Sequence, residues 1–132
     1  MAVIVVVEDD VDVREVTVMV LRRAGHTVTV AGDGVAGLEA VRDKRPDVVV
    51  SDIEMPLMSG VEMCRAIRAE PATSDLPVLL VSGSVAVGDT RPADAGATAF
   101  LRKPFQGREL LECVQKVLHA GHQPGQPPTE CP

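Results

Sequence analysis

Apolar residues along the chain alternate between short unbroken runs and longer stretches with helical spacing. Three runs of four or five residues are almost wholly aliphatic: Val3–Val7, Asp47–Ser51 and Val78–Val81. Continuous runs of this length are typical of strands that are buried on both faces, as in a parallel sheet covered by helices. Two weaker strands are expected at Thr27–Ala31 and Ala97–Leu101.

Between these runs, apolar residues recur at intervals of three and four, the spacing of a buried helix face. Four helices follow from this pattern: residues 12–24 before Gly25, a second around Leu38 and Val41, a third over about 61–67, and a last one over about 110–118. The alternation of strands and helices predicts a doubly wound α/β sandwich with right-handed crossovers.

One segment departs from this rhythm. A fourth helix would be expected between Ser84 and Gly96, but Gly88 and Pro92 both oppose a long helix there. Asp89 could cap a short helix that tolerates Pro92 in its first turn. We therefore expect a short or irregular fourth helix.

The C-terminal segment, residues 120–132, differs in composition from the rest of the chain. It holds four of the ten prolines and almost no apolar residues, so we expect a disordered tail or the start of a linker after a domain that spans residues 1–119. The three cysteines fit neither a disulfide framework nor a zinc site. Cys64 and Cys113 lie on apolar helix stripes and are interpreted as core residues, whereas Cys131 has no assigned role.

Composition narrows the range of partners. The 132 residues carry a formal net charge of −6, which argues against direct binding to nucleic acid. The chain has two Phe and no Tyr or Trp, which argues against a site that stacks nucleic-acid bases or sugar rings on aromatic side chains. No apolar run approaches the roughly 18–20 residues of a membrane span, and the start resembles no signal peptide. We expect a cytoplasmic protein without a membrane partner.

The candidate chemistry lies just after the predicted strands. Glu8 and Asp9 follow the first strand, Asp52 the third, Ser82 ends the fourth, and Lys103 follows the fifth. In open α/β sheets, ligands bind outside the carboxyl ends of the strands. Three carboxylates in one place repel one another unless a cation lies among them, and oxygen ligands suit Mg²⁺ or Mn²⁺. Such a site fits phosphoryl transfer, in which a carboxylate can act as the nucleophile.

Four motifs at these positions resemble the receiver domain of two-component response regulators, over residues 2 to about 119. The motifs are Glu8-Asp9, Ser51-Asp52-Ile53-Glu54-Met55-Pro56 with Ser59-Gly60, Val81-Ser82-Gly83 and Lys103-Pro104-Phe105. The resemblance implies a flavodoxin-like, five-stranded parallel sheet of order 2-1-3-4-5 with five helices. The segment from Gly88 to Pro92 departs from the family by being one residue short.

The resemblance also implies a metal site and a phosphoacceptor. Asp52 would accept the phosphoryl group, and Asp9, Asp52 and the backbone carbonyl of Glu54 would bind Mg²⁺ directly. Glu8 would hold the metal through water. The phosphodonor would be a phosphohistidine on a sensor histidine kinase or a histidine phosphotransfer protein.

The remaining site residues concern the phosphoryl group itself. By resemblance, Lys103 would contact it and Ser82 would turn toward it. Phe100 stands where the family often has an aromatic that changes rotamer, although an ordinary core role is equally open. Glu54 and Ser84, each two residues after a site residue, are expected to tune the lifetime of the phosphoryl group.

The predicted function is thus a phosphorylation-dependent switch that catalyses its own phosphorylation and slow dephosphorylation, and not an enzyme on small substrates. Its output would be an unknown partner or a fused effector, reached through the fourth helix, fifth strand and fifth helix. The irregular fourth helix predicts a monomer or a weak dimer. Three alternatives are a pseudo-receiver that only binds proteins, a hydrolase with Asp52 as nucleophile, and a flavin carrier. A hydrolase of this kind would need a cap domain, and a flavin carrier would need a phosphate-binding loop after the first strand instead of acids.

Overall fold

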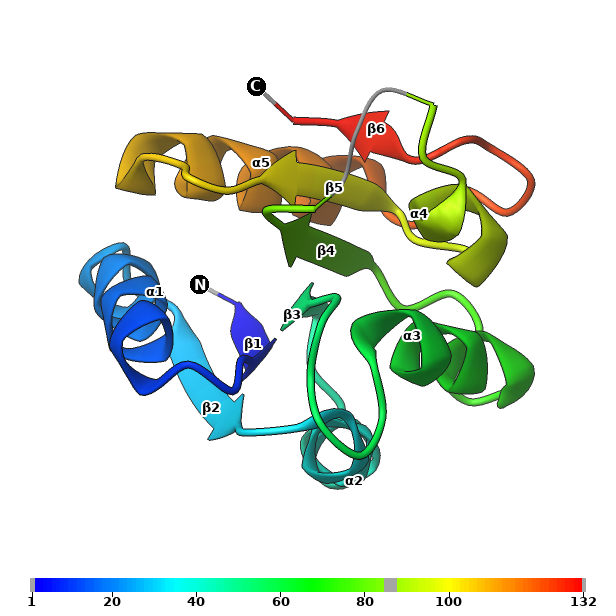
Figure 1. Ribbon diagram of the computed structural model, residues 1–132, viewed down its shortest axis with the longest axis horizontal. Coiled ribbons are helices and arrows are strands. Elements are labelled where there is room, and N and C mark those ends of the chain that lie inside the picture. Colours follow the sequence, from blue (N-terminus) through cyan, green and yellow to red (C-terminus); the bar gives the residue numbers. More distant parts are fainter. Residues whose placement is uncertain (1, 85–87, 132) are drawn as a thin grey trace.

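A computed structural model describes residues 2–84 and 88–131 of the chain, and it contains one parallel sheet with helices on both faces (Figure 1). The strands are β1 (Val3–Val7), β2 (Thr27–Ala31), β3 (Val48–Asp52), β4 (Val78–Ser82), β5 (Ala99–Arg102) and β6 (Thr129–Glu130). The helices are α1 (Val11–Arg23), α2 (Gly34–Lys44), α3 (Gly60–Ala69), α4 (Arg91–Ala95) and α5 (Gly107–Ala120).

The sheet has the strand order β2-β1-β3-β4-β5-β6, and every pair of neighbours is parallel. Helices α1 and α5 cover one face, while α2, α3 and α4 cover the other (Figure 1). The predicted doubly wound fold and the order 2-1-3-4-5 are confirmed, with β6 as an additional short strand beside β5. Within residues 2–84 and 88–131, no helix has the length and apolar character needed to cross a membrane.

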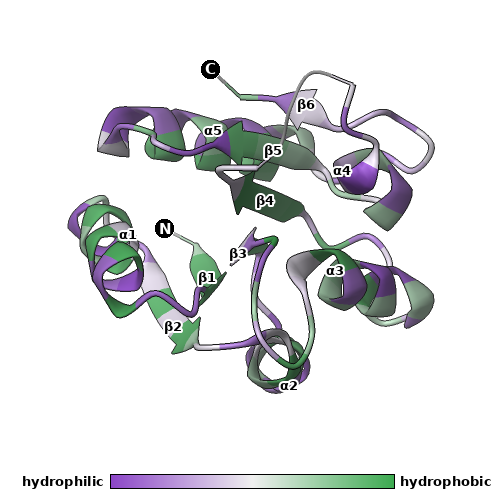
Figure 2. Cartoon of the chain, in the orientation of Figure 1, coloured by the Kyte–Doolittle hydropathy of each residue, from purple (hydrophilic) through white to green (hydrophobic). Residues whose placement is uncertain are grey.

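Two aliphatic layers hold the helices to the sheet. Alternate residues of β1 divide between them, because neighbouring side chains of a strand point to opposite faces. Ile4 and Val6 join the layer under α1 and α5, and Val5 and Val7 join the layer under α2 and α3. Figure 2 shows the central strands as the most hydrophobic part of the chain, which explains why they read as unbroken apolar runs in the sequence.

The fourth helix is short, as predicted: α4 spans five residues. Pro92 lies in its first turn, where a missing N–H costs no hydrogen bond. Gly96 ends it in the left-handed region, at a φ of 80°, which glycine adopts without steric strain. The prediction of irregular structure also covers residues 85–87, which lie outside the described residues.

The C-terminal segment differs from the prediction. The expected disorder is wrong for the part of residues 120–132 that the structure describes, because the chain returns along β5 and adds β6 to the sheet. Cys131 is 5 % exposed and forms a disulfide with Cys113 of α5, with 5.7 Å between their Cα atoms. Cys113 is a core residue, as predicted, but it is also a disulfide partner. The two cysteines are 18 residues apart, and only the reversal of the chain after α5 brings them together.

Candidate functional site

The carboxyl ends of β1 and β3 bring three acidic side chains together. Glu8 and Asp9 follow β1, and Asp52 is the last residue of β3. One carboxylate oxygen of each lies within 4.8 Å of the others. Glu8 and Asp52 are buried and Asp9 is exposed. The strands place these residues, because parallel β1 and β3 end at the same edge of the sheet.

The loop after β3 holds the Asp52 carboxylate in one orientation. The backbone N–H of Ile53 donates to Asp52 Oδ1 at 2.8 Å, and the N–H of Gly60 donates to the carbonyl of Ile53 at 2.8 Å. A Cβ at position 60 would lie 2.0 Å from the carbonyl oxygen of Asp52. Only glycine therefore allows α3 to begin this close to the end of β3.

Lys103 is the cation nearest to these carboxylates. Its Nζ donates to Glu8 Oε1 at 2.7 Å and to Asp52 Oδ2 at 3.2 Å. Burial disfavours the ammonium, but the hydrogen bond to Glu8 and the charge of Asp52 outweigh burial and hold the pKa of Lys103 above its usual value. The lysine thus remains charged beside the Asp52 carboxylate.

Glu8 shows the electrostatic cost of the acidic cluster. Burial raises the pKa of Glu8 to about 7, the hydrogen bond to Lys103 opposes this rise, and Asp52 adds to it. One ammonium thus does not compensate the buried carboxylates fully. A divalent cation with oxygen ligands would supply the missing positive charge, so the donor set fits Mg²⁺ or Mn²⁺.

The hydroxyl of Ser82 is oriented toward Glu54. It donates to Glu54 Oε2 at 2.9 Å, and its oxygen accepts from the backbone N–H of Ser84 at 3.0 Å. The Ser84 hydroxyl donates to Glu54 Oε1. Partial burial acts to raise the pKa of Glu54, but the hydrogen bonds from Ser84 and Ser82 outweigh it and hold that pKa below its usual value. Glu54 and both serines therefore form one hydrogen-bonded group.

Arg91, at the start of α4, joins this group and was missed by the sequence analysis. Its Nη1 lies 3.2 Å from Glu54 Oε1, and its Nη2 donates to the Ser84 hydroxyl at 2.8 Å. Arg91 also pairs with Asp89 at 2.8 Å. Nothing in the sequence singles it out, since the contact joins residues 37 positions apart. Through Arg91, the fourth helix is linked to the loops that surround Asp52.

Phe100 lies on β5, opposite Leu80 of β4, and is partly buried. It packs against the apolar layer under α2 and α3. This placement fits an ordinary core role, because Phe100 contacts the apolar layer. It also fits a switch role, because β5 ends one residue before Lys103. The rotamer switch stays a prediction.

Comparison with known proteins agrees with the geometry of the site. Residues 4–115 match the family described as the response regulator receiver domain. The chain is 40 % identical over 121 residues to the transcriptional regulatory protein CseB of Streptomyces avermitilis, covering 90 % of this chain and 50 % of that protein. It is 36 % identical over 116 residues to the DNA-binding response regulator MtrA of Mycobacterium tuberculosis, covering 87 % and 50 %. The chain thus spans about half the length of these relatives.

Two solved structures show how far the similarity extends in three dimensions. The chemotaxis response regulator CheY4 of Vibrio cholerae superimposes with a TM-score of 0.84 at 32 % identity, over 89 % of this chain and 98 % of that one. The receiver domain of a sensor histidine kinase from Pseudomonas aeruginosa gives 0.84 at 28 % identity, again over 89 % and 98 %. In that structure, a magnesium ion is coordinated in the active site cleft.

Proposed function

The chain belongs to the response regulator receiver domain family, and from this membership we propose that Asp52 accepts a phosphoryl group from a phosphohistidine and so acts as a signalling switch. The observation that carries the proposal is the group of Glu8, Asp9, Asp52 and Lys103 at one edge of the sheet. The phosphodonor would be a sensor histidine kinase or a histidine phosphotransfer protein.

The residues divide the work of the transfer. One oxygen of Asp52 attacks phosphorus, a P–O bond forms, and the P–N bond to the donor imidazole breaks with its electron pair leaving on nitrogen. The Ile53 N–H, 2.8 Å from Oδ1, limits rotation of the carboxylate. Lys103 Nζ, 3.2 Å from Oδ2, places an ammonium where the transferred oxygens carry negative charge. Positioning and charge stabilisation of this kind are what phosphoryl transfer requires.

The metal site would be formed by Asp9, Asp52 and the Glu54 carbonyl, with Glu8 acting through water. When bound, Mg²⁺ or Mn²⁺ would neutralise charge on the phosphoryl oxygens and between the carboxylates. The close approach of three carboxylates, with a single lysine within hydrogen-bond distance of Glu8 and Asp52, supports this assignment.

Wild-type protein incubated with acetyl phosphate and Mg²⁺ is expected to gain one phosphate adduct, measured by intact mass and located on Asp52 by peptide mapping. With EDTA in place of Mg²⁺, the adduct should be lost because the carboxylate cluster then repels the phosphoryl oxygens. Absence of any adduct in the folded protein would favour the pseudo-receiver. Continuous release of phosphate from many organic phosphates would instead favour the hydrolase.

After phosphorylation, the switch would operate through Ser82. Its hydroxyl now donates to Glu54, and a phosphoryl group on Asp52 offers a second strong acceptor at the end of the neighbouring strand. Rotation of Ser82 would remove a hydrogen bond from Glu54 and weaken the group that includes Ser84 and Arg91. Phe100 on β5 would then change its rotamer. A modification can shift the population only toward a conformation that improves such contacts.

The lifetime of the phosphoryl group is expected to depend on Glu54 and Ser84. The double substitution Glu54→Ala with Ser84→Ala removes two side chains that hydrogen-bond to Ser82 and that we propose control the access of water to a phosphoryl group on Asp52. We expect the dephosphorylation rate, followed by loss of the adduct after removal of acetyl phosphate, to change by about 3- to 10-fold, which is less than the roughly 10²–10⁴-fold that a general acid or base contributes. Glu39→Ala, at an exposed position of α2, is the control. A rate equal to that of the wild type would rule out this role.

A surface beside the site suits the phosphodonor. On α1, Val11, Val16 and Met19 expose 52 %, 55 % and 44 % of their surface. An apolar hollow next to them is lined by residues of α1 and by Lys103 and Phe105. Exposed apolar surface of this kind is typical of a protein interface, and its position beside Lys103 would bring a donor histidine to Asp52.

The output of the switch would lie outside the receiver domain. Two similar regulators are described as transcriptional or DNA-binding, and the chain matches only half of each. We infer that a partner protein or a fused effector carries the output, while the receiver domain itself, at a net charge of −6, makes no direct contact with nucleic acid. A cytoplasmic location and a monomer or weak dimer complete the proposal, because α4 offers only five residues to a dimer face.

A further inference from the structure

The C-terminal strap, defined here as residues 121–131, lies across the edge of β5 (Figure 1). Its strand β6 pairs in parallel with β5, with Thr129 opposite Ala99 and Glu130 opposite Phe100. The N–H of Thr129 donates to the carbonyl of Thr98 at 3.1 Å, and the N–H of Cys131 donates to the carbonyl of Phe100 at 2.9 Å. The strap is therefore bonded to the backbone of the predicted switch residue.

Noncovalent contacts hold the strap only weakly. Residues 123–127 are exposed, as are Thr129 and Glu130. The ion pair of Arg102 with Glu130, at 3.0 Å, leaves the two side chains 39 % and 52 % exposed, and such pairs contribute little in water. At the start of the strap, Nδ1 of His122 lies 2.8 Å from the Thr98 hydroxyl and 3.1 Å from Nη2 of Arg68. Because most of its residues are exposed, a segment of this kind can open locally without unfolding the domain.

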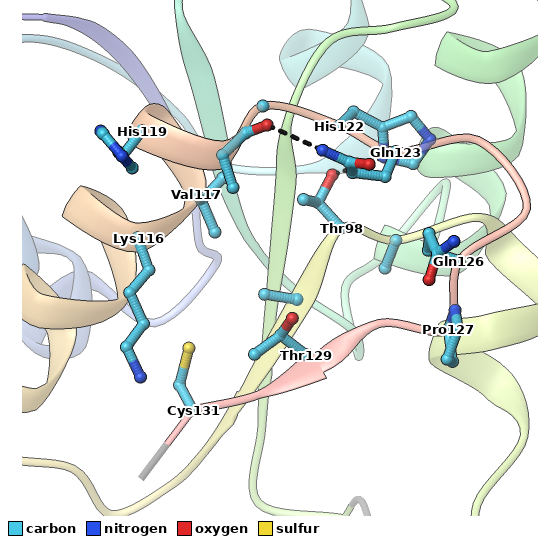
Figure 3. A pocket seen from close by; sticks show the side chains of 14 residues that line it. Thr98, Lys116, Val117, His119, His122, Gln123, Gln126, Pro127, Thr129 and Cys131 are labelled. Atoms are coloured by element: carbon cyan, nitrogen blue, oxygen red, sulfur yellow. Dashed lines mark hydrogen bonds between the residues drawn. The ribbon is translucent and has the colours of Figure 1, made fainter.

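A cavity separates the strap from the body of the domain. Its volume is about 330 Å³, and its lining comes from β5, from the end of α5 and from the strap. Figure 3 shows Lys116 and Val117 of α5 on one side, with Thr129 and Pro127 of the strap on the other. The strap thus covers this face without filling it, and Cys131 is the strap residue that joins the aliphatic layer under α1 and α5.

The disulfide is the strongest attachment of the strap. Cys131 joins the strap to Cys113, which is fully buried on α5. Closing a loop of this length restricts the open states and favours the attached one by roughly 100-fold. Cys131 lies at the end of the strap that is far from α5 in the sequence, so cleavage of the disulfide allows the amides of Thr129 and Cys131 to exchange with water more readily.

We propose that Cys113 and Cys131 form a reversible redox site, and that reduction by a dithiol releases the strap from the edge of β5. A thiolate of the reductant attacks the sulfur of Cys131, and Cys113 leaves as a thiolate. The second thiol of the reductant then displaces Cys131. The protein disulfide gains two electrons and two protons, and the dithiol becomes a disulfide. In the reverse reaction, glutathione disulfide accepts the two electrons and is reduced to two thiols.

The consequence for signalling rests on the proposed function. The strap covers β5 and the end of α5, which belong to the face expected to report phosphorylation. In the oxidised form, β6 occupies the hydrogen-bonding edge of β5 and limits that face. In the reduced form, the edge becomes available to an extended segment of an output protein, which could pair with it as a strand. Cytoplasmic thiols are normally reduced, so the site would respond to oxidising conditions.

Hydrogen exchange measured by NMR on the full chain tests directly whether the disulfide holds the strap on β5. Dithiothreitol, or the substitution Cys131→Ser, is expected to increase exchange of the Thr129 and position-131 amides by roughly 100-fold, while amides of β1 and β3 keep their protection. Cys64→Ser is the matched control, because Cys64 is a buried free thiol outside the strap, and it should retain the slow exchange of the oxidised protein. Equal protection in the reduced and oxidised proteins would overturn the proposal.

Reversibility and the link to phosphorylation are tested separately. Reduced, folded protein placed in glutathione disulfide should lose two alkylatable thiols together, counted by intact mass after maleimide treatment; failure to re-form the pair would refute a reversible site. The Asp52 adduct is measured in both redox states. If neither redox state forms the adduct but exchange still depends on the redox state, the proposed function is refuted and the redox site is supported.

Discussion

Asp52→Asn is expected to abolish the phosphate adduct formed with acetyl phosphate and Mg²⁺, with a loss of at least about 100-fold in the initial rate, as for removal of a nucleophile. An amide oxygen is a poor nucleophile, and the substitution removes one of the three charges that would bind the metal. The fold should remain, because Asn keeps the shape of Asp and its side-chain oxygen can still accept from the Ile53 N–H, now at 2.8 Å. Intact mass of the variant and the wild type measures the effect.

Asp43→Asn is the matched control for this substitution. Asp43 lies on α2 with 76 % of its side chain exposed, and it pairs only loosely with Lys44, at 3.7 Å. The substitution makes the same chemical change as Asp52→Asn but outside the site, and it should leave the amount of adduct unchanged. A normal adduct in Asp52→Asn would show that another residue accepts the phosphoryl group, and the proposed mechanism would then be wrong.

Lys103→Met should slow phosphorylation by about 100-fold, since one well-placed charged donor in a water-poor site contributes about that much to a transition state. Methionine retains most of the apolar stem of lysine but removes the ammonium, which now lies 2.7 Å from Glu8 and 3.2 Å from Asp52. The rate is followed by intact mass at several concentrations of acetyl phosphate. We expect the loss mainly in the maximal rate, because the ammonium meets charge that develops during transfer.

Two further variants serve as controls for Lys103→Met, one at an exposed lysine and one that keeps the charge at position 103. Lys44→Met removes an exposed lysine on α2, 52 % exposed in its side chain, and should leave the rate unchanged. Lys103→Arg retains the charge but presents a planar group with different geometry, so it should recover only part of the rate. A wild-type rate in Lys103→Met, with the fold intact, would exclude the lysine from the transfer.

Much of the site could be predicted from the sequence because it depends on strand ends. Glu8, Asp9, Asp52 and Lys103 each follow or end a recognisable apolar run, and parallel strands end at a common edge. The structure places these four residues together, as expected. Their roles in phosphoryl transfer still require the experiments above. Asp10 also follows β1, but it caps α1 by accepting from the N–H groups of Asp12 and Val13 at 2.9 and 3.1 Å.

Residues whose positions depend on irregular segments were less accessible to prediction. Arg91 contacts Glu54 because the start of α4 lies beside the loop after β3. The Ser82 hydroxyl donates to Glu54 at 2.9 Å, a contact that likewise joins residues far apart in the sequence. The pattern of apolar residues predicts helices and strands. It does not predict which polar side chains in the loops contact one another.

The parallel sheet, the short fourth helix and the acidic edge could be predicted from the sequence, because period, composition and strand ends are local properties of the chain. The path of residues 121–131 depends instead on contacts between distant parts of the chain. Their many prolines and few apolar residues predict disorder, and backbone hydrogen bonds to Thr98 and Phe100 together with the disulfide to Cys113 outweigh that tendency. Such a covalent link depends on the distance between two sulfurs, which the chain reversal after α5 makes short.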